Sequence, residues 1–285
     1  MSAQTIIVTR PAGQARQLIE LLSTSLKNDA LVNLGKQALP QILSLPLLTI
    51  VPKGDESRDS QTDPLTDHIE TTLKNTDLAI FISPNAIECT MRLLGGSWQD
   101  FSKKIIPIGV MGGSSKFALQ HHGIGLEEMP TTIFLPENNE HWDSEGLWKE
   151  LQSLDWNWSE RKVVIFKGDG GRDWLADTLA AAGATVEAIS VYARVPLDID
   201  SSAWDAIHKI DFAQSLWLLT SSEAVRYLGE VIHDQFSQTL LFASAICPHQ
   251  NIGEAAKGIG FGKVFICEPG DDALIKASQV WLSLN

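Results

Sequence analysis

The sequence predicts an α/β fold with two parallel sheets that are covered by helices. Three observations support this prediction: short apolar runs alternate with helical-period segments, part of the chain is repeated, and proline ends two extended stretches. Such alternation is typical of parallel sheets, because the connection between two parallel strands usually contains a helix. The length of 285 residues exceeds that of a typical single hydrophobic core, which favours two domains.

Apolar runs of strand length recur along the chain. Their Val, Ile, Leu and Phe residues follow one another with few polar interruptions, as in strands that are buried on both faces. The expected strands are Thr5–Val8, Leu47–Val51, Leu78–Ile82, Ile105–Ile108, Val163–Phe166, Val186–Val191, Leu216–Leu219, Leu240–Ile246 and Val264–Cys267.

Segments with helical periodicity separate these runs, and several begin with a residue that is favoured at a helix N-cap. The expected helices are Gln14–Ser25, Leu65–Lys74, Asn85–Leu94, Ser114–His122, Ser144–Leu154, Gly171–Ala182, Ser222–His233, Asn251–Gly258 and Asp271–Leu282. The polar segment Lys53–Pro64 contains Gly54 and is expected to be an exposed loop.

The chain repeats two strand-loop-helix patterns. Phe81–Ile87 is echoed by Leu219–Val225, and Ile7–Leu18 is echoed by Val164–Leu175. Each copy is a short apolar run, a turn of small or polar residues, and a helix-like stretch. The repeat therefore predicts two similar sheets with a cleft between them.

Two extended stretches are expected to cross between the domains. Ser44–Pro52 and Ala188–Pro196 both end in proline, which suits edge strands or a two-stranded linker. The chain would then leave the first domain early and return to it late. The expected boundaries are 1–45 with 197–285 for domain 1, and 46–196 for domain 2, with linker strands near 47–51 and 188–195.

Charge and cysteine content limit the class of partner and the compartment. The net charge of −13 argues against nucleic acid and anionic membranes, because both require a basic face. Cys89, Cys247 and Cys267 are odd in number and unclustered, which favours buried thiols in a reducing compartment over disulfides or a metal site. No stretch resembles a targeting or membrane segment, so a cytoplasmic protein is expected.

The candidate binding residues lie where the expected strands end. Ligands of open α/β sheets bind at the carboxyl ends of strands, and helix N-termini there carry unpaired N–H groups and a partial positive charge. These loops are rich in hydroxyls, glycine and amides, which predicts a multiply charged anionic ligand. The candidate residues are Arg10, Ser83, Pro84, Asn85, Ala86, Gly109, Gly112, Ser144, Lys167, Gly168, Arg172, Ser221, Ser222, Glu223, His249 and Gln250.

Each of these signals also has a simpler interpretation. Ser83, Ser144 and Ser222, taken singly, are more typical of N-caps than of a binding site. His121, His122 and His249 lack metal-ligand spacing and triad partners, so solvent-exposed or loop positions are favoured over catalysis for them. Neither a phosphate-binding P-loop nor a dinucleotide fingerprint is present, so nucleotide binding is weakly supported.

The order and spacing of several motifs resemble the uroporphyrinogen-III synthase family. The motifs are Val8–Pro11, Ile82–Ala86, Ser144–Leu147, Gly168–Arg172 with Leu175, Val191–Tyr192 with Arg194, Thr220–Ala224, and Ile252–Ala256 with Gly260–Phe261. The resemblance covers nearly the whole chain and implies two uroporphyrinogen-synthase-like, or flavodoxin-like, parallel-sheet domains. It also implies that a two-stranded β linker joins them and that both chain ends contribute to the first domain.

The resemblance further implies a reaction. A member of this family is a cyclising lyase: it closes linear hydroxymethylbilane to uroporphyrinogen III, with loss of water and inversion of the last ring, and it needs no cofactor or metal. Tyr192 matches the family's proposed acid, although a linker tyrosine that only packs is an alternative. The expected partner is this small molecule, and a monomer is expected. A non-catalytic two-domain binder of a polyanion is the alternative function.

Overall fold

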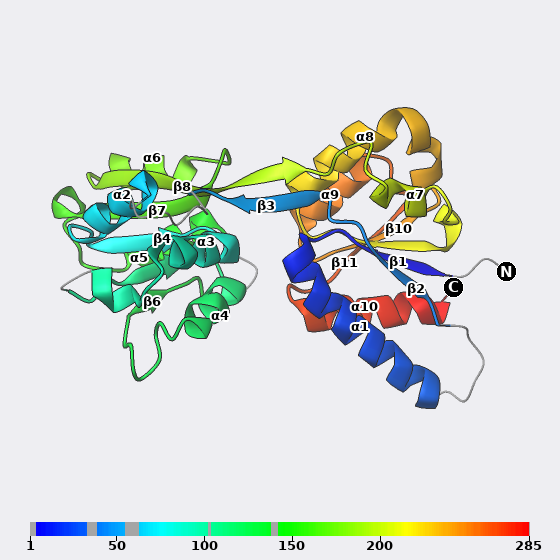
Figure 1. The fold of residues 1–285 in the computed structure, drawn as a ribbon, viewed down its shortest axis with the longest axis horizontal. Coiled ribbons are helices and arrows are strands. Elements are labelled where there is room, and N and C mark those ends of the chain that lie inside the picture. The colour runs from blue at the N-terminus through cyan, green and yellow to red at the C-terminus, as the bar shows by residue number, and fades with distance from the viewer. Residues whose placement is uncertain (1–3, 33–38, 55–62, 102–103, 138–141, 285) are drawn as a thin grey trace. The chain divides into compact units, whose positions relative to one another are not determined.

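The computed structural model describes residues 4–32, 39–54, 63–101, 104–137 and 142–284. The described residues form two compact units, which we call unit 1 (Met1–Thr49 with Val195–Asn285) and unit 2 (Ile50–Arg194). Most of the expected loop Lys53–Pro64 lies outside the described residues. Each unit is an α/β layer structure with its own sheet (Figure 1).

The described part of unit 1 contains a five-stranded sheet in the order β11-β10-β9-β1-β2, and its neighbouring strands are parallel. The strands are β1 (Thr5–Val8), β2 (Gln41–Ser44), β9 (Ser215–Leu218), β10 (Ser244–Cys247) and β11 (Lys263–Ile266). The helices are α1 (Ala12–Val32), α7 (Ala203–Ile207), α8 (Ser222–Leu240), α9 (Gln250–Gly258) and α10 (Asp271–Leu284).

The described part of unit 2 contains a six-stranded sheet in the order β3-β8-β7-β4-β5-β6, and the strands from β8 to β6 are parallel. The strands are β3 (Leu48–Pro52), β4 (Leu78–Phe81), β5 (Ile108–Val110), β6 (Ile133–Phe134), β7 (Lys162–Gly168) and β8 (Thr185–Pro196). The helices are α2 (Pro64–Leu73), α3 (Pro84–Leu94), α4 (Gly113–His121), α5 (Ser144–Gln152) and α6 (Trp174–Ala181).

Both sheets are covered by helices on two faces, which explains why their strands are continuously apolar. In unit 1, Ile6 faces a core with Leu18 of α1 and Leu274 of α10, while the next residue, Ile7, faces a core with Leu228 of α8. All five of these side chains are fully buried. Figure 1 shows α1 and α10 on one side of this sheet and α8 on the other.

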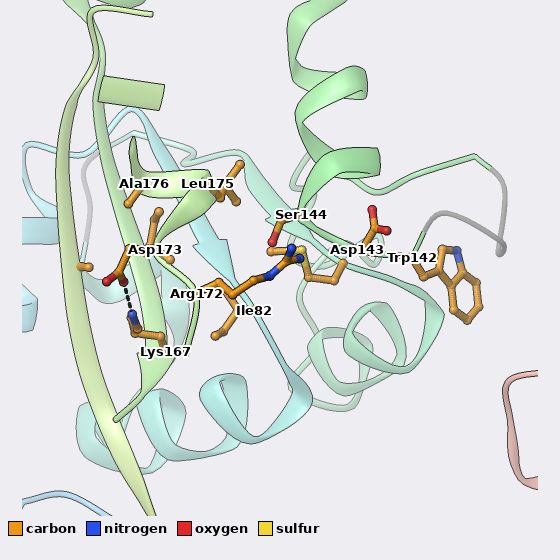
Figure 2. A pocket seen from close by; sticks show the side chains of 12 residues that line it. Ile82, Trp142, Asp143, Ser144, Lys167, Arg172, Asp173, Leu175 and Ala176 are labelled. Carbon is orange, nitrogen blue, oxygen red and sulfur yellow. Dashed lines mark hydrogen bonds and ion pairs between the residues drawn. The ribbon is translucent and has the colours of Figure 1, made fainter. Parts of the chain in front are cut away.

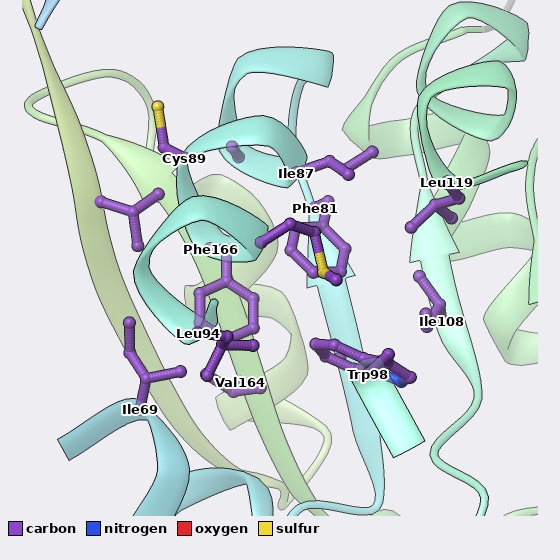
Figure 3. Close-up of a cluster of buried hydrophobic side chains, with 14 of the residues drawn as sticks. Ile69, Phe81, Ile87, Cys89, Leu94, Trp98, Ile108, Leu119, Val164 and Phe166 are labelled. Atoms are coloured by element: carbon purple, nitrogen blue, oxygen red, sulfur yellow. The ribbon is translucent and has the colours of Figure 1, made fainter. Parts of the chain in front are cut away.

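The same alternation builds the two cores of unit 2. Phe81 and Phe166 stack with ring centroids 4.9 Å apart beneath α3, and Trp98 lies against Phe81 at 5.7 Å (Figure 3). On the opposite face, Ile80 and Ile165 belong to a separate core with residues of α5 and α6. Central strands buried in this way position the loops at their ends.

The internal repeat is present in the three-dimensional order of the strands. Ser83 follows β4 as Ser221 follows β9, and Lys167 lies at the end of β7 as Arg10 lies just after β1. When β4 is matched with β9 and β7 with β1, the orders β6-β5-β4-β7-β8 and β11-β10-β9-β1-β2 become the same. The α/β fold with parallel sheets, as predicted, is confirmed.

Strands β3 and β8 are neighbours and extend across the boundary between the two units along the chain. The N–H of Lys53 donates to the carbonyl of Val191 at 2.9 Å, and the N–H of Leu197 donates to the carbonyl of Leu47 at 2.9 Å. The two segments therefore run in opposite directions. Pairing of this kind satisfies the backbone groups of both segments where they pass between units.

Several predicted boundaries are wrong, for local reasons. The strand expected at Leu240–Ile246 begins only at Ser244, because Leu240 ends α8 and the next two residues are exposed. The strand expected at Ile105–Ile108 is displaced to β5, and Ile105 is exposed. The helix expected from Gly171 begins at Trp174, because Gly170 and Gly171 adopt positive φ angles.

Among the described strands and α-helices, three short ones were not predicted. The edge strand β2 has a mixed polar sequence, β6 contains two residues, and α7 contains five. None is long enough to show a clear periodicity, and each depends on pairing or packing with distant segments. Their absence from the prediction does not change the fold class.

We predict that the negative charge of Asp77, which lies just before β4, stabilises the fold through the hydrogen bonds that its carboxylate accepts. Its carboxylate accepts hydrogen bonds from Lys104 Nζ at 2.7 Å and from the N–H of Lys162 at 2.9 Å. Desolvation acts to raise the pKa of Asp77, but these two hydrogen bonds and the neighbouring cations outweigh it and hold the pKa below 3.8. Asp77→Asn should lower the free energy of unfolding by about 1 kcal/mol at neutral pH.

The pH dependence provides the check. A depressed pKa stabilises the fold above the pKa of the unfolded chain, and this contribution is lost as pH falls through the folded-state value. The difference between wild type and Asp77→Asn should therefore be constant from pH 7 to about pH 5 and shrink below it, as measured by chemical denaturation. The exposed Asp155→Asn variant is the charge-matched control. A difference that persists unchanged at pH 2 would contradict the role of the charge.

Candidate functional site

Each sheet has one point at which the strand order reverses. In unit 1 the reversal lies between β9 and β1, and in unit 2 between β4 and β7. Ligands of open α/β sheets bind beyond the carboxyl ends of strands at such points, where adjacent connections lead to opposite faces. The residues there are Ser221 and Arg10 in unit 1, and Ser83 and Lys167 in unit 2. The topology thus brings these predicted residues together in pairs.

In unit 2 the reversal point contains a buried phenol. The Tyr192 side chain on β8 is fully buried, and its hydroxyl lies 3.1 Å from Ser83 Oγ. Arg194 Nη2 donates to the same hydroxyl at 2.8 Å, and its guanidinium carbon lies 5.1 Å from the ring centroid. Gly168 lies against the ring, because a Cβ added there would be 2.6 Å from it. Only glycine leaves room for this phenol.

A second polar cluster lies beside the phenol. Asp169 Oδ1 accepts hydrogen bonds from Lys53 Nζ at 2.5 Å and from Ser190 Oγ at 2.7 Å. These bonds, Lys53 first, hold the pKa of the Asp169 carboxyl below its usual value of 3.8. The N–H of Asp169 donates to the carbonyl of Tyr192 at 2.9 Å. The cluster therefore attaches the loop after β7 to β8.

A cavity of about 290 Å³ opens at the carboxyl ends of β4 and β7 (Figure 2). Apolar side chains, including Ile82, Met111 and Leu175, form part of its wall, and the predicted residues Ser144, Lys167 and Arg172 form another part. A mixed apolar and polar lining is typical of small-molecule sites. Three of the predicted binding residues therefore share one cavity.

The cations of this cavity are paired with carboxylates of the same unit. Lys167 Nζ is bound to Asp173, as Figure 2 shows. Arg172 binds Glu145 through both of its terminal nitrogens, at 3.0 and 3.1 Å. An anionic ligand that reaches either cation must compete with a protein carboxylate.

Gly112 and Gly113 let an aromatic ring approach the backbone. A Cβ on Gly112 would be 2.7 Å from the Trp142 ring, and one on Gly113 would be 2.8 Å from it. Gly109, by contrast, is buried within β5 between Ile80 and Leu147. Of the predicted binding glycines, Gly112 therefore borders the cavity wall through Trp142, and Gly109 lies in the sheet.

In unit 1, Arg10 occupies the position that corresponds to Lys167. Arg10 Nη1 lies 2.5 Å from Asp271 Oδ1 at the start of α10, and Arg10 Nε donates to Thr220 Oγ1 at 3.4 Å. Ser221 Oγ accepts from the N–H of Ala224 at 3.3 Å and begins α8. The cation of unit 1 is thus also paired with a carboxylate, and the serine that follows β9 caps a helix.

The serines and His249 begin helices, although two of the expected caps are displaced by one residue. Ser83 caps α3 as expected, with its Oγ 3.2 Å from the N–H of Ala86. Asp143, and not Ser144, caps α5, and Ser221, and not Ser222, accepts the capping bond of α8. An acceptor one residue earlier reaches the N–H groups of the first turn equally well.

The remaining candidates lie at the starts of helices. His249 caps α9, with its Nδ1 accepting from the N–H of Asn251 at 3.2 Å, and the exposed Gln250 begins that helix. Glu223 is exposed in the first turn of α8. In the first turn of α3, Pro84 and Asn85 are half-buried, whereas Ala86 is fully buried and contributes its backbone alone.

Sequence reasoning missed several residues of the site. Met111, Trp142 and Asp173 line the cavity, and Lys53 binds the loop after β7. The sequence did contain evidence for Arg194. Residues two apart in a strand lie on the same face, and Arg194 follows Tyr192 at that spacing, so the two side chains were predictable as neighbours. No feature of the sequence predicted that Asp173 pairs with Lys167. A carboxylate repels an anionic ligand, so Asp173 was not a candidate for binding one.

The cysteines are not activated nucleophiles. Burial raises the pKa of the Cys89 thiol to about 11 and that of Cys247 to about 12. A thiol needs a lowered pKa to react at neutral pH. Within the described residues, no group of three or more His, Cys, Asp or Glu side chains is arranged to hold a metal ion.

None of the described helices is both long and apolar enough to cross a bilayer.

The fold and these loops define a class: a two-unit, doubly wound α/β protein with candidate ligand loops at the reversal point of each sheet. A family model described as uroporphyrinogen-III synthase HemD matches residues 9–276. The chain belongs to this family. It is therefore an enzyme, a cyclising lyase of tetrapyrrole biosynthesis.

Individual relatives agree with this assignment. The uroporphyrinogen-III synthase of Escherichia coli is 24% identical over 278 residues, which cover 96% of this chain and 100% of the relative. That of Salmonella typhimurium is 24% identical over 281 residues, with the same coverage. Solved structures of uroporphyrinogen III synthases from Thermus thermophilus (a mutant) and Helicobacter pylori match 99% of this chain and 100% of theirs, with TM-scores of 0.59 and 0.56. Because the sequence identities are only 13% and 14%, these two matches show similarity of fold alone.

We predict that the carboxylate partners weaken anion binding at the cavity. Glu145→Gln frees Arg172 from its bidentate partner, so uroporphyrinogen III should bind roughly two- to fivefold more tightly at low salt, as expected for an exposed ion pair. Equilibrium titration at two salt concentrations is the measurement. Glu128→Gln, which removes the same charge from an exposed position of the unit, is the control. Equal effects of both variants would mean that net charge alone is responsible.

Proposed function

We propose that this enzyme closes hydroxymethylbilane to uroporphyrinogen III at the reversal point of unit 2. The observation that carries the location is the convergence of Ser83, Gly168 and Tyr192 at the ends of β4 and β7. Their chain neighbours Ile82 and Lys167 line a cavity that also contains Arg172. Membership in the family supports the reaction. The relatives from Escherichia coli and Salmonella typhimurium are named for the same product.

The loops suit a substrate that carries many carboxylates. In unit 2 the helices α3 and α5 begin at or beside Ser83 and Ser144, and in unit 1 the helices α8 and α9 begin at Ser222 and Gln250. The amide N–H groups and positive end of each helix therefore point toward the loops of its own unit. The cations Arg10, Lys167 and Arg172 add point charges. Because each of these cations already has a carboxylate partner, substrate binding would exchange one ion pair for another, without burying an unpaired charge.

The chemistry needs positioning and one proton donor. Departure of the terminal hydroxyl as water leaves an electrophilic methylenepyrrolenine, which the substituted α-carbon of the last pyrrole attacks to form a spiro intermediate. Holding a curled substrate makes this attack intramolecular, and positioning of that kind removes much of a barrier. We propose Tyr192 as the acid for the first step, because its phenol is an O–H donor within hydrogen-bond distance of Ser83.

We also propose the two-domain division, with domain 1 at 1–45 and 197–285, domain 2 at 46–196, and linker strands near 47–51 and 188–195. The two compact units and the pairing of β3 beside β8 support this division. A monomeric, cytoplasmic enzyme completes the proposal. Free thiols at Cys89, Cys247 and Cys267 support a reducing compartment.

The decisive test compares the products formed from freshly prepared hydroxymethylbilane. The enzyme should give the type III isomer, whereas spontaneous closure gives type I. Separation of the isomers by chromatography after oxidation to porphyrins is the measurement, with heat-denatured protein as the control. A non-catalytic binder of polyanions, the alternative function, would leave the product as type I even though it binds the substrate.

We predict that Tyr192→Phe slows turnover by a factor of about 10² to 10⁴, the usual contribution of a single proton donor. Product affinity should be nearly unchanged, and the remaining product should be type III, because the substrate is still held in its curled form. Steady-state rates and an isomer assay check this. Tyr227→Phe is the matched control, because Tyr227 donates to the carbonyl of Leu197 in unit 1. A wild-type rate for Tyr192→Phe would place the acid elsewhere.

A further inference from the structure

The Tyr192 phenol does not reach the surface of its unit. Its side chain is fully buried with Phe166 and Val191 in the core beneath α3. Ser83, by contrast, is half-buried at the end of β4, and its Oγ lies 3.1 Å from the phenol oxygen. If the phenol supplies a proton to a substrate outside the core, an intervening group must carry that proton.

The hydrogen bonds determine the direction in which that proton points. Arg194 Nη2 donates to the phenol oxygen at 2.8 Å, so this bond uses an acceptor site of the phenol and leaves its own proton unplaced. The second partner of the hydroxyl is Ser83 Oγ. A buried O–H is almost always hydrogen-bonded, so the phenol proton points to Ser83. The serine hydroxyl proton is then free to point away from the core.

Ser83 is held in place for this task. Its Oγ also accepts the N–H of Ala86 at 3.2 Å, so the first turn of α3 fixes the position of the oxygen. Gly168 lies against the phenol ring and leaves no space for a larger residue. The chain from Arg194 through Tyr192 to Ser83 is therefore a continuous series of positioned donors and acceptors that ends at a half-buried hydroxyl.

We infer that Ser83 is the group that protonates the departing hydroxyl, that Tyr192 replaces the proton of Ser83, and that Arg194 is a positioning residue that holds the phenol. This inference rests on the proposed function. It differs from a direct phenol donor because Ser83 becomes the catalytic residue that touches the substrate, and Tyr192 supplies the proton from within the core.

The proton movements balance. The C–O bond of the hydroxymethyl group breaks with its electron pair on oxygen, and Ser83 gives its proton to that oxygen, so water leaves. Tyr192 gives its proton to Ser83, and the resulting phenolate faces the guanidinium of Arg194, 2.8 Å away. The spiro intermediate then opens, because the bond between the spiro carbon and the methylene of the third ring breaks. That methylene bonds to the unsubstituted α-carbon of the last pyrrole, and this carbon loses a proton, which returns to Tyr192 through Ser83. No oxidant or cofactor takes part in these steps.

A double-mutant cycle tests the relay. Two groups that pass one proton act as a unit, so their effects do not multiply. Ser83→Gly and Tyr192→Phe should each slow turnover by about 10² to 10⁴, and the double variant should be no slower than the slower single one. Ser83→Gly is preferred to Ser83→Ala because glycine is tolerated at an N-cap. Multiplying effects would overturn the relay.

Ser221 provides a matched control. It follows β9 as Ser83 follows β4, and its Oγ accepts a capping bond of similar length, 3.3 Å from the N–H of Ala224. Ser221 has no phenol partner among its described hydrogen bonds. Any effect of Ser221→Gly should therefore multiply with that of Tyr192→Phe. A cycle with Ser221 that shows the same non-additivity would mean that loss of the helix cap, and not a relay, explains the result.

Two further variants separate chemistry from packing. Ser83→Thr keeps the hydroxyl and should restore turnover to within about tenfold of wild type. Arg194→Gln removes the cation beside the phenol and should slow turnover while leaving the type III product and the KM nearly unchanged. Thermal unfolding of each variant checks that the fold is intact. Failure of Ser83→Thr to recover activity in a folded protein would overturn the role of the hydroxyl.

The outcomes also separate this inference from the function on which it rests. If wild-type enzyme yields type I product, the proposed function fails, whatever the cycle shows. If wild-type enzyme yields type III and the effects of Ser83→Gly and Tyr192→Phe multiply, the function stands and the relay is wrong.

Discussion

The reversal of strand order within each sheet is the constraint on which the candidate site depends. At a reversal the connections from two adjacent strands lead to opposite faces, so their loops separate and leave space beyond the strand ends. The orders β6-β5-β4-β7-β8 and β11-β10-β9-β1-β2 place this reversal at matching strands of the two units. Ser83 and Lys167 in unit 2 therefore correspond to Ser221 and Arg10 in unit 1. Duplication has preserved the position of the loops while their side chains have diverged.

The two units differ most clearly at the Tyr192 phenol of unit 2. The serine of each unit caps a helix, at 3.2 Å in unit 2 and 3.3 Å in unit 1, but Ser83 alone of the two also contacts Tyr192 among the described hydrogen bonds. A buried hydroxyl requires partners, and Ser83 and Arg194 supply them. The tyrosine belongs at once to the hydrophobic core and to the polar site. Packing against Gly168 thus fixes the position of the proposed proton donor.

The candidate binding cations of this chain form ion pairs with carboxylates of the protein. The cations at the reversal points, Arg10 and Lys167, and the neighbouring Arg172 each bind a carboxylate of their own unit. Pairing keeps these charges satisfied in a chain with a net charge of −13, a charge that opposes long-range attraction of a polyanion. Recognition of an anion then depends on short-range exchange of partners and on helix N-termini, whose partial charges do not depend on the net charge.

The sequence by itself determined the fold class, the repeat and the positions of the loops, because strands buried on both faces are continuously apolar and loop residues follow them directly. Ser83, Ser144, Lys167 and Arg172 were therefore predictable as residues of the loops beyond the strands, and the motif order predicted the family. Tertiary structure alone decided that Asp173 pairs with Lys167, that Trp142 covers Gly112, and that β2 and β6 complete the sheets. It also decided that the Tyr192 phenol is buried. These features depend on which distant segments become neighbours in the folded protein. The local periodicity of the sequence does not contain that information.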